Sequence, residues 1–260
     1  MKILFIGDVI GRPGRQSLEE FLPDCLASGD IDLVIANAEN SAGGLGTTPE
    51  ILKEMEGLGV QAFTMGNHTW RKRVLIHAIN DLNNIVRPAN YPKGTPGRGA
   101  MIITLPDDRK VGIINLLGRV YMEAYDCPFA TVDRELLALK QQTDVILVDM
   151  HCEATSEKIA MGWHLEGKVS AVVGTHTHVQ TADDWVLPGG TAYITDVGMC
   201  GPITSVIGTE CDAVVSKFRT GMPRSFNVAK GPSSFCAVVI EVDDKSGKAT
   251  SIERIFERQA

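Results

Sequence analysis

Residues 2–9, KILFIGDV, place an apolar run directly before a Gly-Asp pair. Such a run, bounded by Gly and a polar residue, is typical of a buried strand. The same arrangement recurs in DLVIANAEN (32–40), QAFTMGNH (61–68), DVILVDMH (144–151) and SAVVGTHTH (170–178). Because ligands of α/β sheets gather outside the carboxyl ends of the strands, we expect the five ends to meet at one site.

The five strand ends supply two carboxylates, two Asn amides and up to four imidazoles. The residues concerned are Asp8, Glu39, Asn40, Asn67, His68, His151, His176 and His178. This set is large enough to bind two divalent cations, so the sequence predicts a dinuclear metal hydrolase. A carboxylate as deep as that of Glu39 requires a partner, which two cations ~3.5–4 Å apart would provide by sharing it.

The histidines have distinct expected roles. His176 and His178 alternate along a stretch expected to be extended, which would place their rings on one side, where they could serve two metals or one. His151 adds a third imidazole. His68 would lie beside the metals, where an imidazole that titrates near neutrality can protonate a departing alkoxide. A purely orienting or core role for His68 is the alternative.

Simpler interpretations exist for several positions. Asp8 precedes a Gly-Arg-Pro-Gly turn and could cap a helix. The Gly-rich segment 41–46 could bring backbone close to a ligand or be a plain flexible loop. His77 and His164 lack such surroundings and are expected to be structural or at the surface.

The six cysteines include no C-x-x-C pair, so we expect buried thiols rather than a zinc site or disulfides.

Composition restricts the class of protein. The chain has 260 residues, 44% of them hydrophobic and 22% charged, which is ordinary for a soluble globular protein. The net charge of −7 argues against a sequence-blind polyanion binder, although bound cations would reverse the local field around a phosphorylated substrate. With no apolar stretch near ~20 residues and no signal-peptide pattern, we expect a cytoplasmic protein without membrane contact. Homo-oligomerisation is compatible with such a chain.

The order of expected elements indicates an α/β protein. Strand-like runs fall near 2–7, 31–37, 60–65, 100–105, 110–116, 144–150, 169–174, 191–196, 235–242 and, more weakly, 250–256. Helical patterns cover 15–28, the stretch that follows Thr48-Pro49, 70–82, 131–140 and 155–162. The early alternation predicts parallel βαβ units, and the strand-rich remainder predicts antiparallel pairing or a second sheet. No linker divides the chain, so residues 1–260 are expected to form one domain. Segment 198–232 suggests either a flap over the site or a surface excursion.

The order of these motifs resembles that of the calcineurin-like metallophosphoesterases. That family carries D-x-H, G-D-x-x-D, G-N-H-[DE], a later His and G-H-x-H; Walker A, G-x-G-x-x-G and G-x-S-x-G motifs are absent from this chain. Three departures from the pattern are present. Asp8 lacks the His two residues later, Glu39-Asn40 stands where the family has a bridging Asp, and Thr69 follows His68 in place of an acidic residue.

These departures resemble one bacterial branch, the 2′,3′-cyclic-nucleotide 2′-phosphodiesterase-like proteins. The matching motifs are GDVIGRPGR (7–15), NAEN (37–40), GNHTW (66–70), HCEATSEK (151–158) and GTHTHVQTADD (174–184). The resemblance is nearly full length. It implies an α/β fold built as a four-layer α/β/β/α sandwich with two mixed sheets.

The resemblance also implies two divalent cations, with Fe or Mn expected. One metal would be bound by Asp8, Glu39, Asn40 and His178, and the other by Glu39, Asn67, His151 and His176. Glu39 would bridge the metals. A metal-activated water would attack phosphorus and His68 would protonate the leaving oxygen, which would convert 2′,3′-cyclic nucleotides to 3′-nucleotides.

Other functions fit the same residues. The protein could be a metal-containing regulator that binds a cyclic nucleotide or RNA ends with little turnover, a phosphomonoesterase, or a structural protein with a relic site. The expected partner is a small phosphodiester. Arg12, Arg119 and Lys217 are candidates for contacting phosphate.

Overall fold

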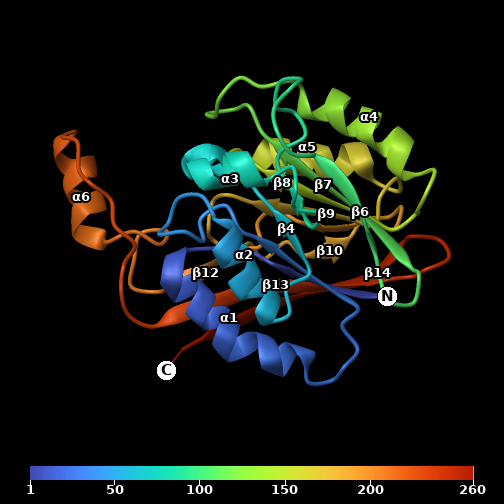
Figure 1. The fold of residues 1–260 in the computed structure, drawn as a ribbon, viewed down its shortest axis with the longest axis horizontal. Coiled ribbons are helices and arrows are strands. Elements are labelled where there is room, and N and C mark those ends of the chain that lie inside the picture. The colour runs from blue at the N-terminus through green and yellow to red at the C-terminus, as the bar shows by residue number, and fades with distance from the viewer. Residues whose placement is uncertain (260) are drawn as a thin grey trace.

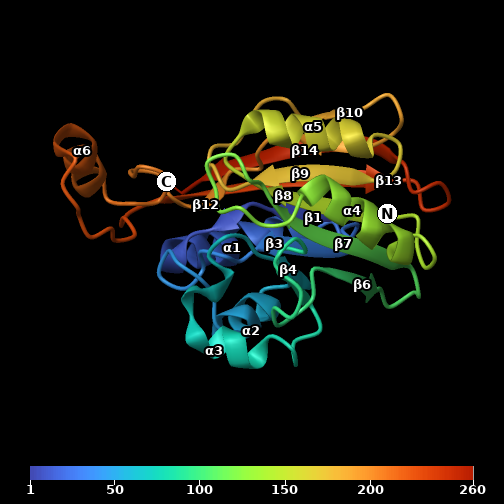
Figure 2. The same ribbon diagram turned by 90° about the horizontal axis from the view of Figure 1, so that it is seen from above.

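Two mixed β-sheets pack face to face in the computed structural model, which describes residues 1–259. Helices cover the outer face of each sheet, as Figure 2 shows most clearly. The architecture is the α/β/β/α sandwich that the sequence predicted. Among the described residues, no helix is long and apolar enough to cross a bilayer.

The first sheet holds the chain termini and the early βαβ units. Within residues 1–259 its strands are β1 (Lys2–Ile6), β2 (Asp8–Val9), β3 (Leu33–Asn37), β4 (Ala62–Thr64), β5 (Ile85–Val86), β12 (Met199–Pro202), β13 (Ser233–Val242) and β14 (Ala249–Arg258). They lie in the order β2-β12-β13-β1-β3-β4-β5, with β14 paired to β13. The run β1-β3-β4-β5 is parallel, which was predicted for β1, β3 and β4, whereas β13 is antiparallel to both β1 and β14.

The second sheet contains the middle of the chain. Its strands in the described part are β6 (Ala100–Thr104), β7 (Lys110–Leu117), β8 (Ile146–His151), β9 (Ala171–Thr175), β10 (Trp185–Val186) and β11 (Ala192–Ile194). They lie in the order β10-β11-β9-β8-β7-β6. The inner strands β7, β8, β9 and β11 are parallel, and the outer strands β6 and β10 are antiparallel to their neighbours.

The helices fall on the two outer faces, with one exception. They are α1 (Gly11–Leu26), α2 (Pro49–Gly57), α3 (Arg73–Ala78), α4 (Pro128–Leu139), α5 (Thr155–Leu165) and α6 (Cys211–Thr220), with a 3-10 turn η1 (Thr69–Arg71). Helices α1 to α3 lie against the first sheet and α4 and α5 against the second, whereas α6 projects from the body of the molecule (Figures 1 and 2).

The helices differ most from the sequence prediction in two places. Helix α1 begins at Gly11 instead of residue 15. Pro13 suggested a turn, but proline is tolerated in the first helical turn, where its missing N–H would have no partner. The segment 70–82 is divided into η1 and α3 instead of forming one helix. Helix α6 was not predicted and lies in the segment expected to be a flap or an excursion.

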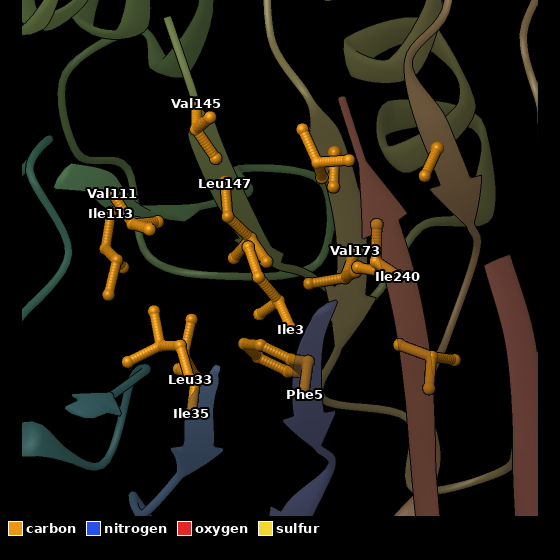
Figure 3. Packing of buried hydrophobic residues seen from close by; sticks show 14 of the residues in the cluster. Ile3, Phe5, Leu33, Ile35, Val111, Ile113, Val145, Leu147, Val173 and Ile240 are labelled. Atoms are coloured by element: carbon orange, nitrogen blue, oxygen red, sulfur yellow. The ribbon is translucent and has the colours of Figure 1, made fainter. Parts of the chain in front are cut away.

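The apolar core between the sheets holds them face to face. Ile3 and Phe5 of β1 point into the space between the sheets, while Leu4 of the same strand packs toward the helices on the outer face. Val111 and Leu147 face them from the second sheet (Figure 3). Alternate residues of each strand are thus buried between the sheets. Their burial contributes roughly 25 cal/mol per Å² of apolar surface, which stabilises the face-to-face packing.

Candidate metal centre

The eight residues singled out from the sequence come together, and both sheets contribute to them. The first sheet supplies five, on β2 and directly after β3 and β4: Asp8, Glu39, Asn40, Asn67 and His68. The second sheet supplies three, at the end of β8 and after β9: His151, His176 and His178. The expectation that the strand ends converge therefore agrees with the structure.

The Nε2 atom of His151 is the centre of the tightest cluster. It lies 3.0 Å from Asn67 Oδ1, 3.0 Å from His176 Nδ1 and 3.2 Å from Glu39 Oε1. Ligand atoms of Glu39, His151 and His176 all lie within 4.8 Å of one another. Oxygen and nitrogen lone pairs crowded this closely are stabilised by a shared positive charge, so this group fits a cation.

Asp8 and His178 form a second group next to the first. The Oδ1 atom of Asp8 is buried, has no hydrogen-bond partner and lies 3.8 Å from His178 Nε2. The amide of Asn40 lies 3.3 Å from the same His178 nitrogen. A buried carboxylate oxygen without a partner is costly, and a cation is the partner that this donor set would accept.

Gly66 leaves the space in which the first group meets. A Cβ atom at this position would lie 2.3 Å from Glu39 Oε2 and 2.4 Å from His151 Nε2. The backbone amide of His68, two residues later, donates to Glu39 Oε2 over 2.8 Å. The Gly66-Asn67-His68 segment therefore both approaches the carboxylate closely and orients it.

A chain of buried hydrogen bonds sets the tautomer of His151. The hydroxyl of Thr175 donates to Asp149 Oδ1 over 2.7 Å, so its oxygen must accept the proton on His151 Nδ1, 2.8 Å away. Asn37 donates to the other oxygen of Asp149 over 3.1 Å. This arrangement directs the lone pair of neutral His151 Nε2 at the cluster, as hydrogen bonds behind metal-binding histidines commonly do.

Thr175 and Asp149 were not predicted from the sequence to have a role in the site. Both lie within apolar runs and both are buried, although a carboxylate inside such a strand could have signalled a polar partner. Burial raises the pKa of Asp149 to about 6, although nearby His151 and the hydrogen bond from Thr175 oppose the shift. Above that pH the ionised carboxylate of Asp149 accepts the hydrogen bonds from Thr175 and Asn37.

The backbone that carries His176 and His178 is strained. Their φ angles are +97° and +65°, so the expected extended conformation is wrong at these two residues. Two carboxylates hold the loop: Asp8 Oδ2 accepts from the backbone N–H of His176 over 3.1 Å, and Asp196 Oδ2 accepts from that of Thr177 over 3.0 Å. Such conformations persist where the surroundings determine them, often at functional sites.

A buried ion pair supports the loop that carries His176 and His178. Lys158 and Asp196 are both fully buried, and their Nζ and Oδ2 atoms lie 2.7 Å apart. The other oxygen of Asp196 accepts from the backbone N–H of Gly198 over 2.8 Å. Both charges are thus satisfied, and no role for either residue was predicted from the sequence.

The electrostatics of the cluster favour positive charge. Burial opposes ionisation of Glu39, but contacts with His151 and His68 hold the pKa of its carboxyl well below the usual range. Burial alone would lower the pKa of His151, yet the charges of Glu39 and Asp8 raise it to about 9. Burial, together with the charge of His151, lowers the pKa of His176 to about 3. Without a metal, His151 therefore carries a proton on Nε2, at the centre of the cluster, at neutral pH.

His68 lies at the opening of the site. Its Nδ1 atom is 2.7 Å from Asn40 Oδ1 and 3.2 Å from Glu39 Oε1. The residue lines a cavity of about 270 Å³, as do Asn40 and His178. Asn40 thus presents its amide nitrogen, not its oxygen, to Glu39 and His178, and binding of a metal through the oxygen requires the amide to turn over.

The remaining candidates have more ordinary surroundings. His77 is exposed on α3, and His164 on α5 is half-buried and pairs with Asp133 at 2.9 Å. Arg12, Arg119 and Lys217 are exposed. All six cysteines are free, as expected, and three of them are buried.

Two mixed sheets that join a carboxylate, amide and imidazole cluster at their common edge define a phosphoesterase of the calcineurin-like class. A family model described as YmdB-like protein matches residues 4–255. The chain therefore belongs to the YmdB-like family.

Individual relatives cover nearly the whole chain. The chain is 46% identical over 256 residues to the 2′,3′-cyclic-nucleotide 2′-phosphodiesterase of Bacillus subtilis, covering 98% of this chain and 97% of that protein. A crystal structure of a hypothetical protein from Thermus thermophilus superposes with a TM-score of 0.93 at 38% identity, covering 100% of both chains. A phosphatase from Mycoplasma pneumoniae superposes with the same TM-score at 35% identity, covering 99% of this chain and 93% of that one.

Proposed function

We propose that this protein is a dinuclear-metal phosphodiesterase that opens 2′,3′-cyclic nucleotides to 3′-nucleotides. The prediction of a phosphoric diester hydrolase is confirmed by the 46% identity to the Bacillus subtilis phosphodiesterase. The observation that carries the metal chemistry is the set of three donor atoms within 3.2 Å of His151 Nε2. The unpartnered oxygen of Asp8 beside this cluster supports a second cation.

The donors divide into two overlapping sets that share Glu39. One cation would be held by Asp8, Glu39, Asn40 and His178, and the other by Glu39, Asn67, His151 and His176. Bound divalent cations would neutralise phosphate oxygens and lower the pKa of an attacking water. We propose Fe or Mn; the Irving–Williams order alone would not select either, so availability in the cell must contribute.

His68 is placed to hold the proton that the reaction must deliver. Hydrolysis forms a bond from a water oxygen to phosphorus and breaks the bond from phosphorus to the ribose 2′ oxygen. The departing oxygen then takes a proton, and the 3′-phosphate remains. If Asn40 turns its amide to bind a metal, its NH₂ group faces His68 Nδ1, and the mobile proton of His68 moves to Nε2. Donation from Nε2 is general acid catalysis.

A second candidate is a phosphomonoesterase, which is favoured by the description of the Mycoplasma pneumoniae structure as a phosphatase. A regulator that binds cyclic nucleotides or RNA ends with little turnover is a third. The same cluster would serve all three functions, because each requires a phosphate held by cations. The reaction products distinguish them.

The test is hydrolysis of 2′,3′-cyclic AMP with Mn²⁺, or with Fe²⁺ under anaerobic conditions, followed by chromatography against 2′-AMP and 3′-AMP standards. We expect 3′-AMP, and no product after treatment with a chelator. Hydrolysis of 3′-AMP without hydrolysis of the cyclic diester would favour the phosphomonoesterase. Tight binding without turnover, in protein shown to contain two metals per chain, would favour the regulator.

A further inference from the structure

A cavity with mainly apolar walls opens beside the metal centre. Its volume of about 270 Å³ is close to the lower end of the roughly 300–1,000 Å³ that is typical of small-ligand sites. The metal-centre residues Asn40, His68 and His178 form one end. Of the described residues that line it, none carries a carboxylate, an ammonium or a guanidinium group, so it is unsuited to a second phosphate.

The opposite walls come from two segments that are distant in sequence. One is the Gly-rich loop after β3, where Gly44 and Leu45 line the cavity. The other is the chain on either side of α6, which contributes Ile207 and Phe226. The two walls touch, since a Cβ atom on Gly44 would lie 2.7 Å from Val228 Cγ2. The segment around α6 therefore closes one side of the cavity, although α6 itself projects away (Figure 1).

This wall is fixed to the metal centre by a strained residue. The backbone carbonyl of Ile207 accepts a hydrogen bond from His178 Nδ1 over 2.9 Å. Ile207 has a φ angle of +47°, which is a genuine outlier for a β-branched residue. Strain of this kind persists where neighbouring structure determines it. The cavity wall and the orientation of His178 are thus linked.

Phe226 offers an aromatic surface in this wall. Its side chain is 46% exposed, although it lines the cavity, and the ammonium of Lys217 lies 4.9 Å from the ring centroid. Stacking of a nucleobase on an aromatic side chain is favourable and tolerates any base, because every base has a π-face.

The position of His68 decides which part of a substrate faces this cavity. In the proposed reaction the leaving oxygen belongs to the ribose, so its proton donor must face the nucleoside. His68 lines this cavity. The other cavity that borders His178 is lined by Gln180, Arg254 and Phe256 among others, and His68 is not among its described lining residues.

We propose that this cavity is a nucleobase subsite, in which the base of a nucleoside 2′,3′-cyclic phosphate stacks on Phe226 and packs against Leu45. The proposal rests on the proposed phosphodiesterase function. It assigns Phe226 to substrate binding and not to the chemical step. Loss of its ring removes binding made equally in the ground state and the transition state, which raises KM and leaves kcat unchanged.

The test compares two substrates with three proteins. The substrates are 2′,3′-cyclic AMP and the 2,3-cyclic phosphate of methyl riboside, which has no base. The proteins are the wild type, Phe226→Ala and the control Phe218→Ala, which removes another exposed phenylalanine, on α6 and 83% exposed. We expect Phe226→Ala to raise KM for 2′,3′-cyclic AMP by about tenfold or more with kcat within about twofold. It should not change the kinetics with the base-free substrate, and Phe218→Ala should match the wild type with both.

Failure of the subsite and failure of the function give different results. If wild-type protein hydrolyses both substrates with equal kcat/KM and Phe226→Ala alters neither, the subsite is wrong and the phosphodiesterase stands. An equal effect of Phe226→Ala on both substrates also overturns the subsite, because the lost interaction is then not with the base. If the wild type, loaded with metal, hydrolyses neither substrate, the proposed function fails and the subsite fails with it.

Discussion

The Nδ1 atom of His151 lies 2.8 Å from the hydroxyl oxygen of Thr175, in the fully buried interior behind the candidate metal centre. Because the hydroxyl proton is committed to Asp149, this contact sets which nitrogen of His151 is free to bind a metal. Thr175→Val keeps the shape and removes the hydroxyl. We expect metal affinity to fall about 10- to 100-fold, measured by titration of metal-free protein.

Thr175→Ser is the matched control, because it restores the hydroxyl and removes only a methyl group. Its metal affinity should stay close to that of the wild type. Equal affinities for the Val and Ser variants would show that the hydroxyl does not orient His151.

His68→Ala tests the proton donor. Removal of a general acid should lower kcat by about 10²- to 10⁴-fold, while metal content by elemental analysis stays near that of the wild type. Asp8→Ala, by contrast, should deplete one metal. Loss of metal from the His68 variant would count against its role as a proton donor.

Gly66→Ala tests the close approach at the cluster. The new Cβ atom would lie within 2.4 Å of Glu39 Oε2 and His151 Nε2, so these ligands must separate. We expect loss of metal and activity, measured on purified protein. Gly57→Ala is the control, since a Cβ atom there meets nothing within 4 Å and the residue ends α2; that variant should retain both metals and be at least as stable as the wild type.

Metal binding should release protons. His151 has a pKa of about 9 in the metal-free protein, so a cation must displace its proton below that pH, and metal affinity should rise with pH up to about 9. His176, with a pKa of about 3, releases none near neutrality. Calorimetric titrations at about pH 7.5 in buffers of different ionisation enthalpy should give at least one proton per chain. A heat of metal binding that does not depend on the buffer would contradict proton release.

The same proton affects the stability of the metal-free fold. The pKa of His151 is above its ordinary value of 6.5, so protonation stabilises the folded state fully below about pH 6.5, and the contribution is lost as pH rises through about 9. Thermal unfolding of metal-free protein should therefore show a falling Tm over this interval. Metal-loaded protein, whose His151 carries no such proton, should not show that fall.

Lys158→Met tests the buried ion pair between Lys158 and Asp196. It leaves the Asp196 carboxylate buried without its cation, which should lower the free energy of unfolding by about 3–5 kcal/mol in denaturant titrations. The double variant Lys158→Met, Asp196→Asn removes both charges and should recover part of the loss. If the double variant is as unstable as the single variant, the unpaired charge is not the cause.

The sequence predicted the sheets and the convergence of the eight candidate site residues because both depend on local patterns. Apolar runs such as 2–7 and 144–150 coincide with β1 and β8, and each candidate ligand lies at the end of such a run or a few residues after it. The two-residue strands β2, β5 and β10, the four-residue β12 and helix α6 were not predicted. Their conformation depends on pairing partners or on the surrounding chain, which local patterns do not reveal.

The supporting residues could not be found from the sequence for a related reason. Asp149 and Lys158 acquire their roles from partners that lie 26 and 38 residues away in the chain. The loop that carries His176 and His178 is similarly held by Asp8 and Asp196, which lie 168 and 19 residues away from the amides they bind, so the alternation alone suggested an extended backbone. Local polarity shows that such residues exist, but only the fold shows what they contact.

The candidate metal ligands are divided between the two sheets, so the layer of side chains between the sheets determines how far apart the two groups of ligands stand. Phe5 and Leu147 touch no ligand, yet their volume contributes to the thickness of that layer. A substitution there that changes the thickness by a fraction of an ångström would alter metal–ligand distances without changing a ligand. Metal preference and reactivity in this family can therefore diverge through the apolar interior, where a comparison of site residues alone would detect no difference.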